Sequence, residues 1–433
     1  MEKLERIGYL ILNEARTRGA DYAQCSVSES ETKEFNVDGG RFSLMRTLFN
    51  RNIVVTVLKE QRKGTVQINC FDDGAVIAAV AEAIAAADSG QPDPAWQYAE
   101  GPEEKRFTDG MPECDTDLLF SRSAELLKNI GEHHPKIIVE QMITEHTSHT
   151  GLYMNSRKVR YDTRSGSYQF SLMYSAHEGE KSSSFYGSDV TLKTLDRPVI
   201  DCALIERELS AVEQQLDPKP LQGKFVGPVV LAPTALTEIV IDTIMSNFVS
   251  DACLIDGTSI WKDKLGETVA DPSFSLSFNP CSGDVVVPAH YTGEGYTAEN
   301  YDLIRDGKLV SFALSQYGAN KTGGKRAGND SMNMVIPAGK KSLDEIIGEI
   351  DRGVLVMRFS GGEPASSGEF SGVAKNSFLI EKGKIAGALS ETMISGCVPE
   401  MMNRIRAVSS DLLKDGYLSL PYIAFDGLTI SGK

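Results

Sequence analysis

The segment Ala235–Asn247, with the sequence ALTEIVIDTIMSN, has the spacing of a helix and carries carboxylates where a hydrolase could carry metal ligands. Glu238, Asp242 and Ser246 follow one another at i, i+4 and i+8, so they share one helical face. They could hold a cation weakly, but the segment lacks the imidazole or thiolate that a catalytic zinc ion normally uses. A solvated acidic face is the alternative. The apolar residues predict a buried stripe elsewhere on the helix: Leu236, Ile239, Val240, Thr243 and Ile244.

The length of 433 residues predicts two or three domains, each large enough to bury its own core. No apolar run approaches the ~20 residues that a membrane-spanning helix needs. The N-terminal sequence MEKLERIGYL is charged and amphipathic, unlike a secretory signal. We therefore expect a cytoplasmic protein that does not bind membranes.

Cysteine usage and net charge exclude further classes. The seven cysteines are scattered and never form Cys-x-x-Cys, so neither a disulfide framework nor a zinc knuckle is indicated. The net charge of -16 repels phosphate backbones, and no Lys/Arg-rich block offsets it locally. Direct binding of nucleic acid is therefore not expected.

Residues 1–90 predict a first α+β unit, with a helix over 4–18 and an Ala-rich helix over 74–87. Residues 91–112 are predicted to be a linker, because their Pro, Gly and acidic residues do not favour a regular element. Strand patterns lie between the two helices, at 22–28, 33–37, 53–58 and 65–69.

A second α+β unit is predicted over residues 113–218. Its elements are a helix near 115–130, a strand over 136–144, two or three strands between 152 and 190, and a helix over 201–216. Their order resembles that of the first unit. This similarity indicates either a duplication or the chance recurrence of a common pattern.

Residues 219–433 predict a β-rich C-terminal domain. It begins with a strand over 227–231 and the helix quoted above, and Ser342 with Glu345 forms a capping box for a later helix. The expected fold class is therefore α+β, with N-terminal α/β two-layer units followed by a β-rich C-terminal domain.

The histidines offer one candidate metal cluster. Because the strand pattern ends at Thr144, we expect His146 and His149 in the loop after it. They are either solvated there or, together with Glu145, part of a metal site.

His290 precedes the stretch Gly293-Glu294-Gly295, in which a carboxylate lies between two glycines. Glycines let a backbone approach a ligand closely, but the same stretch could also be a tight turn between strands.

The Gly-rich stretch 318–326 departs from a phosphate-binding loop, since Arg326 stands where a magnesium-binding Ser or Thr should be. With Lys325 and Arg326, it is either a mobile loop able to contact a peptide carboxylate or a plain surface loop.

Several short motifs in the last unit resemble, in their order and spacing, the TldD/PmbA family, which was historically labelled as modulators of DNA gyrase and is grouped with metallopeptidases. The resemblance is densest from Gly227 onward. The motifs are CLIDGTS at 253–259, LGETV at 265–269, GEG at 293–295, LIRDGKL at 303–309, YGAN at 317–320 with Gly328-Asn329, and Ser395-Gly396 with VSSDL at 408–412.

The resemblance implies two subunit types. The TldD type carries His-Glu-x-x-x-His on the helix before the Gly-Thr-Ser segment and completes its zinc site with a late cysteine. The PmbA type, also called TldE, lacks these residues and pairs with TldD. The family's usual separation from Gly257 places Asp242, Thr243 and Asn247 at the positions of His, Glu and His. This chain therefore resembles the PmbA type, with no catalytic residue and no zinc of its own.

We expect a pseudoenzyme subunit of a TldD/TldE-type metallopeptidase that forms a heterodimer with a zinc-holding TldD-type subunit and helps to bind unfolded peptides. The isolated chain could instead form a homodimer. One alternative is a self-sufficient peptidase with an atypical metal site at Glu238, Asp242, Glu267 or Glu294. The other is a non-enzymatic regulator that binds gyrase. The candidate peptide-cleft residues are His290, Gly293, Glu294, Gly295, Lys325 and Arg326.

Overall fold

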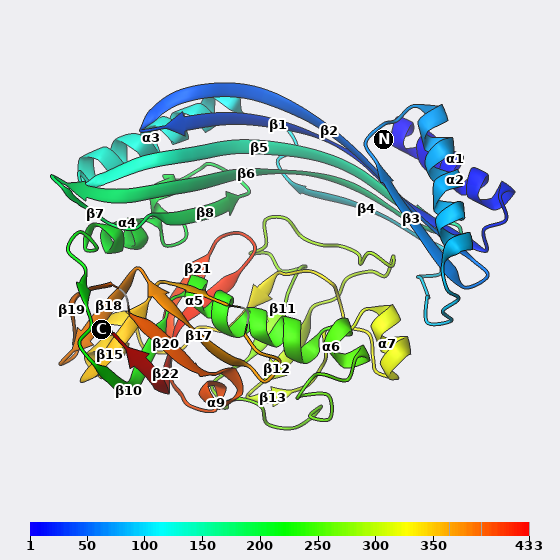
Figure 1. The fold of residues 1–433 in the computed structure, drawn as a ribbon. Helices are drawn as coiled ribbons and strands as arrows, with labels where there is room; N and C mark the ends of the chain where they lie inside the picture. Colours follow the sequence, from blue (N-terminus) through cyan, green and yellow to red (C-terminus); the bar gives the residue numbers. More distant parts are fainter. Residues whose placement is uncertain (363, 391, 433) are drawn as a thin grey trace.

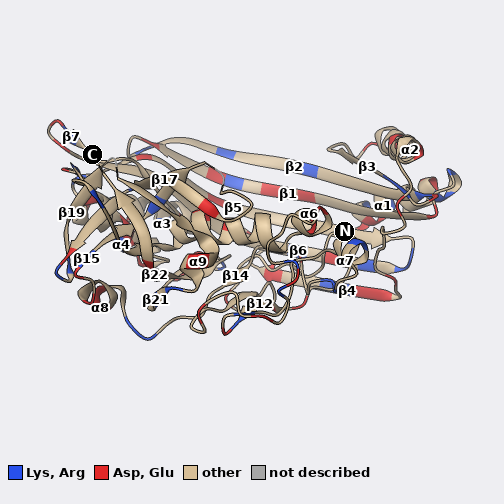
Figure 2. Cartoon of the chain, turned by 60° about the horizontal axis from the view of Figure 1, so that its bottom comes forward, with Lys and Arg blue, Asp and Glu red and all other residues tan. Residues whose placement is uncertain are grey.

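A computed structural model describes residues 1–362, 364–390 and 392–432, and it shows a mixed α+β fold (Figure 1). The predicted fold class is confirmed. A long curved sheet from the N-terminal half arches over a β-rich second domain (Figure 1). Within the described residues, no helix is long and apolar enough to cross a membrane. Acidic residues are spread over both domains, and basic residues lie with them on the long strands (Figure 2).

The first sheet contains strands β1 to β8, and its neighbours follow the order β3-β2-β1-β5-β6-β4, with β7 and β8 also pairing with β6. The four long strands carry 17–20 residues each, which corresponds to roughly 60 Å. The strands are β1 (Tyr22–Asp38), β2 (Arg41–Lys59), β3 (Arg62–Ile68), β4 (Glu103–Gly110), β5 (Ile137–Asn155), β6 (Val159–Glu178), β7 (Lys181–Ser182) and β8 (Tyr186–Leu192). The helices of this half are α1 (Glu2–Thr17), α2 (Asp73–Ser89), α3 (Thr116–His133), η1 (Val199–Asp201) and α4 (Ile205–Glu213).

One face of the sheet is covered by helices near both ends of β1. Val27 packs in a core with α1 and α2, and Phe35 packs in a core with α3. Because side chains alternate along a strand, the even-numbered residues of β1 point to the opposite face. We call that opposite face the hydroxyl face, after its mainly hydroxyl side chains on neighbouring strands: Ser28, Ser30, Thr32, Thr147, Ser165, Ser167 and one histidine, His149.

The order of elements repeats within the first sheet. The series α1-β1-β2-β3-α2 is followed by α3-β5-β6-β8-α4, and β1 pairs antiparallel with β5 at the centre. This arrangement supports the duplication hypothesis. The structure differs from the expected division, however, because one sheet joins the units predicted over 1–90 and 113–218. In addition, β4 lies inside the predicted linker and pairs parallel with β6.

The expectation that His146 and His149 lie in a loop is wrong, because β5 continues to Asn155. Its polar second half remains a strand because β1 and β6 pair with it on both sides. His146 is buried and its Nε2 donates to the Met111 carbonyl (2.8 Å). His149 lies three residues further on and therefore points to the opposite face, so the two imidazoles cannot share a metal ion.

The second sheet contains every strand after residue 218, and β22 lies at its centre beside β10. Its strands are β9 (Lys219–Pro220), β10 (Lys224–Leu231), β11 (Leu276–Phe278), β12 (Tyr301–Arg305), β13 (Lys308–Leu309), β14 (Met334–Val335), β15 (Arg352–Val356), β16 (Arg358–Gly361), β17 (Glu369–Lys375), β18 (Ser377–Glu381), β19 (Lys384–Ser390), β20 (Met393–Cys397), β21 (Ile405–Lys414) and β22 (Ser419–Ser431). The short helices of this domain are α6 (Asp251–Ile255), α7 (Gln316–Thr322), α8 (Leu343–Gly348) and α9 (Val398–Met402).

The predicted helix of the second domain spans residues 233–249 and contains two π-helical stretches. Its parts are α5 (Pro233–Leu236), η2 (Thr237–Ile241) and η3 (Ile244–Val249). The predicted apolar stripe is confirmed, since each of its five residues is buried. The capping box of α8 is also confirmed, with Ser342 and Glu345 bonding each other's backbone N–H.

A shared core joins the two domains at one end of the long sheet. Leu209 of α4 and Val190 of β8 pack in the same cluster as Val230 of β10 and Tyr422 of β22. Glu208 of α4 is buried at this junction and accepts hydrogen bonds from the hydroxyls of Ser188 and Tyr186. Burial raises the pKa of Glu208 to about 7.

We predict that Glu208 makes the protein less stable as the pH rises. Its folded-state pKa of about 7 exceeds the usual 4.5, so the native state binds a proton that the unfolded state has lost. This contribution is present below pH 4.5 and is lost by pH 7. The free energy of unfolding of Glu208→Gln should therefore rise relative to that of the wild type between pH 4.5 and pH 7, by up to about 3 kcal/mol. Urea unfolding at several pH values measures the difference. Glu180→Gln, at an exposed turn, is the control, and a pH-independent difference would contradict the prediction.

Candidate functional site

The helix over 233–249 forms one wall of a cavity of about 540 Å³ in the second domain. Glu238, Asp242 and Ser246, which are predicted to share a face, all line it. Asn247 lines it as well, five residues after Asp242, because π-helical turns bring residues five apart toward one side. Among the described residues, the facing wall includes Phe359, Ser360, Gly361, Gly362 and Pro364.

The side chains around this cavity do not fit a zinc ion. Glu238 Oε2 accepts the Phe359 N–H (2.6 Å), and burial raises the pKa of Glu238. Thr243 is buried, and its hydroxyl donates to a carbonyl one turn earlier. The Asn247 amide donates to the carbonyls of Pro364 and Ala365 in the facing loop at 3.4 Å. Among the described residues, the exposed Asp242 is the other carboxylate that lines the cavity. Among the residues that the structure describes, no group of three His, Cys, Asp or Glu side chains could hold a metal.

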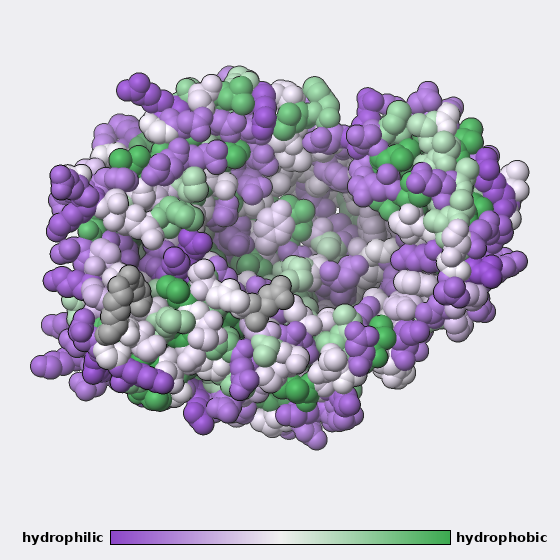
Figure 3. Space-filling view, in the orientation of Figure 1, coloured by the Kyte–Doolittle hydropathy of each residue, from purple (hydrophilic) through white to green (hydrophobic). Residues whose placement is uncertain are grey.

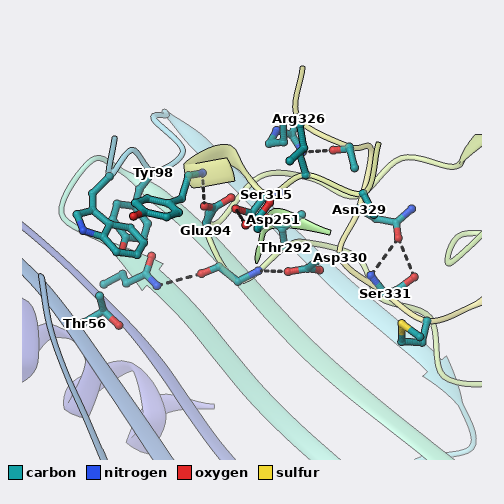
Figure 4. Close-up of a pocket in the computed structure, with 18 of the residues that line it drawn as sticks. Thr56, Tyr98, Asp251, Thr292, Glu294, Ser315, Arg326, Asn329, Asp330 and Ser331 are labelled. Carbon is teal, nitrogen blue, oxygen red and sulfur yellow. Dashed lines mark hydrogen bonds between the residues drawn. The ribbon is translucent and has the colours of Figure 1, made fainter. Parts of the chain in front are cut away.

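A second cavity of about 540 Å³ lies between the two domains, and the molecule is visibly hollowed between the long sheet and the second domain (Figures 3 and 4). Met245 of the 233–249 helix lines this interdomain cavity, so one helix borders both cavities. The first domain contributes side chains of the sheet and of the segment after α2: Gln24, Val54, Thr56, Lys63, Thr65, Trp96 and Tyr98. The second domain contributes Asp251, Thr292, Gly293, Glu294, Tyr301, Ala313, Leu314, Ser315, Tyr317, Arg326, Ala327, Asn329, Asp330, Ser331 and Met332.

Glu294 joins three segments at this cavity (Figure 4). Its carboxylate accepts the backbone N–H of Gln316 (2.7 Å) and of Tyr317 (3.0 Å), which begin α7. Its own carbonyl accepts the N–H of Ala99 (3.0 Å). Burial raises the pKa of Glu294, while the two N–H groups lower it.

Residues 93–99, which we call the interdomain strap, lie in the predicted linker but pack against α7. Trp96 stacks on Tyr317 with ring centres 3.9 Å apart. Asp93 Oδ2 accepts the Tyr317 hydroxyl (2.9 Å) and the Lys321 ammonium (3.1 Å). The expectation that this stretch is only a linker is therefore wrong, because its aromatic and acidic side chains join the domains.

Two cations meet aromatic rings at the interdomain cavity. Lys63 Nζ lies 4.1 Å from the centre of the Trp96 ring, and the Arg326 guanidinium lies 4.2 Å from the centre of the Tyr296 ring. Burial lowers the pKa of Lys63, and the charge of Glu294 partly restores it.

The candidate cleft residues separate into two groups. Gly293, Glu294 and Arg326 line the interdomain cavity, whereas Lys325 is exposed outside it. His290 and Gly295 instead anchor their loop to the first sheet. His290 Nε2 lies 2.7 Å from Asp109 Oδ2, and its ring stacks on Phe107. Gly295 has φ +85°, and a Cβ there would lie 2.2 Å from the Tyr153 hydroxyl.

Lys63, Trp96 and Tyr98 were not among the sequence candidates. The sequence did contain one signal, because Trp96 is one of only two tryptophans and lies with Tyr98 in AWQYA, between proline-containing stretches. Buried aromatic side chains indicate packing rather than a free linker. The position of Lys63 beside this segment depends on tertiary structure.

Comparison with known proteins identifies a family and several relatives of this chain. Residues 223–432 match the family described as the PmbA/TldA metallopeptidase C-terminal domain. The chain is 27% identical over 190 residues to a metalloprotease TldD homolog of Buchnera aphidicola, which covers 41% of this chain and 37% of the relative. It is 25% identical over 218 residues to the metalloprotease PmbA of Escherichia coli O157:H7, which covers 47% of this chain and 48% of the relative. The matches therefore span less than half the length of these curated relatives.

The complete fold also occurs in a solved structure. TldE from Thermococcus kodakarensis superimposes with a TM-score of 0.84 over 98% of this chain and 100% of its own, at 22% sequence identity. At this identity the likeness shows the fold alone. Both TldD and PmbA relatives match this chain, so similarity does not assign the subunit type.

We predict that Glu294→Ala destabilises the protein by about 1–3 kcal/mol, because it leaves two partly buried N–H groups of α7 without their acceptor. Glu299→Ala is the matched control, since Glu299 is exposed nearby and surface substitutions usually change stability by less than ~0.5 kcal/mol. Chemical denaturation measures both variants. Equal stabilities for the two would show that Glu294 does not hold α7 in place.

Proposed function

Since the chain belongs, through residues 223–432, to the PmbA/TldD family of metallopeptidases, we propose that it is the PmbA/TldE-type subunit of a two-subunit peptidase. In this proposal the chain binds unfolded peptides, and a TldD-type partner carries out hydrolysis.

The chemistry of the 233–249 helix carries the proposal. The family resemblance assigns a zinc-binding His-Glu-x-x-x-His motif to Asp242, Thr243 and Asn247. All three residues line a cavity, but the side chain of Thr243 is buried and its hydroxyl donates to the carbonyl of Ile239 in its own helix. Zinc-dependent hydrolysis needs imidazole ligands and a carboxylate that takes a proton from the bound water. We therefore assign the zinc ion to the partner and no catalytic residue to this chain.

The hydroxyl face and the interdomain cavity supply a surface suited to peptides. Gln24 lines the cavity and shares its face of β1 with Ser28, Ser30 and Thr32. Hydroxyl groups both donate and accept hydrogen bonds, so they can pair with a peptide backbone whatever its side chains are. Such a wall favours extended, unfolded chains of varied sequence.

Two alternatives stay predictions. A self-sufficient peptidase would need a metal site without imidazole ligands. Glu238 and Asp242, which line one cavity, are candidate ligands for such a site. A gyrase regulator that mimics DNA would need a concentrated acidic surface, whereas the acidic side chains are spread over both domains (Figure 2). Self-association of the isolated chain also stays a prediction.

The first test mixes the chain with a TldD-type subunit that carries His-Glu-x-x-x-His and measures hydrolysis of an unfolded peptide. We expect the pair to exceed either chain alone by at least about tenfold, since each chain alone lacks part of the site. Asp242→Asn should leave the activity of the pair within about twofold, because the side chain takes no part in transition-state binding. A loss of activity in the pair with Asp242→Asn, comparable to that caused by removing the partner's histidines, would show that this chain is catalytic.

The second test measures the metal content of the purified chain. We expect fewer than ~0.1 zinc ions per chain after dialysis, because the helix offers no imidazole or thiolate ligand. Elemental analysis by mass spectrometry gives the value, and the partner subunit is the positive control. One zinc ion per chain that disappears in Asp242→Asn would support the self-sufficient peptidase instead.

A further inference from the structure

The carboxylates of the interdomain cavity already accept hydrogen bonds from the protein. Glu294 accepts two backbone N–H groups. Asp251 accepts the N–H (3.0 Å) and the hydroxyl of Ser315, and Asp330 accepts the N–H of Gly293 (2.8 Å). These acidic side chains hold the loops in place, so much of their capacity to bind a ligand is used.

Donor groups at the same cavity remain open. Tyr98 is only 4% exposed and lines the cavity, yet its hydroxyl makes no hydrogen bond to another described residue. The Lys63 ammonium contacts the Trp96 ring and no acceptor within the described part of the chain. The Arg326 guanidinium donates to the Ala327 carbonyl (2.9 Å), which uses one of its five N–H groups.

We propose that the interdomain cavity binds the C-terminal carboxylate of a peptide, with Lys63, Tyr98 and Arg326 as its donors. The inference deepens the proposed peptide-binding function and rests on it. Each of the three carboxylates accepts at least one hydrogen bond from the protein, whereas Lys63, Tyr98 and Arg326 keep donor groups that are not bonded to described residues. These donors favour a ligand group that accepts hydrogen bonds and carries a negative charge. A carboxylate suits these donors because its two oxygens can accept several hydrogen bonds, and those from charged donors are the strongest.

The rest of the cavity specifies what the carboxylate is attached to. Met245, Leu314 and Met332 line it beside the aromatic ring of Tyr301, which suits an apolar last residue. A volume of about 540 Å³ lies in the range that ligands of a few residues fill. The peptide upstream of its last residue can then follow the hydroxyl face, which begins at the cavity with Gln24.

Calorimetry on the isolated full chain tests the proposal with two peptides that differ in one group. The probe is acetyl-alanyl-alanyl-leucine with a free carboxylate, and its partner is the same peptide with a C-terminal amide. Neither peptide has an amino terminus or an acidic side chain to bind in its place. We expect the acid to bind at least about tenfold more tightly, because the amide cannot pair with the charged donors. N-acetyl-leucine is expected to bind more weakly than the tripeptide acid, because it lacks the upstream backbone.

Two variants and one control locate the site. Lys63→Gln and Tyr98→Phe should each weaken binding of the acid by about fivefold or more, whereas Lys325→Gln removes an exposed charge outside the cavity and should not. Circular dichroism checks that each variant is folded. Lys63 is exposed at the cavity mouth, so its substitution keeps the test decisive if Tyr98→Phe is unstable.

Tryptophan fluorescence supplies an independent readout. The chain has two tryptophans, and Trp261 is buried in the second domain whereas Trp96 lines the cavity. The acid should change the emission of the wild type, and Trp96→Phe should remove that change.

Equal affinities for acid and amide, or equal effects of Lys63→Gln and Lys325→Gln, would overturn the proposal. This assay uses the chain without a partner. Loss of the carboxylate preference with full activity of the two-subunit peptidase would therefore reject the cavity and keep the proposed function. A carboxylate preference in a chain that never activates a TldD-type partner would keep the carboxylate site and reject the proposed function.

Discussion

The carboxylate of Glu294 joins three segments that lie far apart in the sequence. It accepts the first N–H groups of α7, and the carbonyl of the same residue holds the interdomain strap. The first sheet also contacts the second domain nearby through Asp109 and His290, and at its other end through the core shared by α4, β8, β10 and β22. The contacts of Glu294 hold the strap, α7 and residues 293–294 together, and all three segments line the interdomain cavity.

Local signals were sufficient for much of the fold. The Ala-rich helix predicted over 74–87, which the structure places at 73–89, the capping box at Ser342 and the apolar stripe of the 233–249 helix each follow from spacing and capping residues alone. Sequence patterns did not reveal the length of β5, because its second half is polar and is kept in the sheet by neighbours on both sides. They also could not show that the strands before residue 90 and after residue 113 pair with each other, since that pairing is long-range.

The residues of the candidate site could be predicted only where residue type or a neighbouring glycine pattern indicated them. The residue types on the 233–249 helix exclude a zinc site of the usual composition without any structure. Glu294 and Arg326 could be selected because glycines surround one and a glycine-rich stretch leads to the other. His290 precedes the same glycine-containing stretch, but it anchors its loop to the first sheet through Asp109. Lys63 and Tyr98 become candidates only when β3 and the strap are placed beside α7, and no local pattern encodes that placement.

The two cavities share one helix, so the helix that lacks metal ligands also contributes to the proposed peptide site. One side of the 233–249 helix carries polar residues in place of metal ligands, and the other presents Met245 to the interdomain cavity. In the proposed function this chain binds peptide while the metal lies in the partner. Anomalous X-ray diffraction at the zinc edge, from crystals of the chain with its TldD-type partner, tests this division most directly. We expect one zinc peak, located in the partner. A peak beside Glu238 and Asp242 would contradict it.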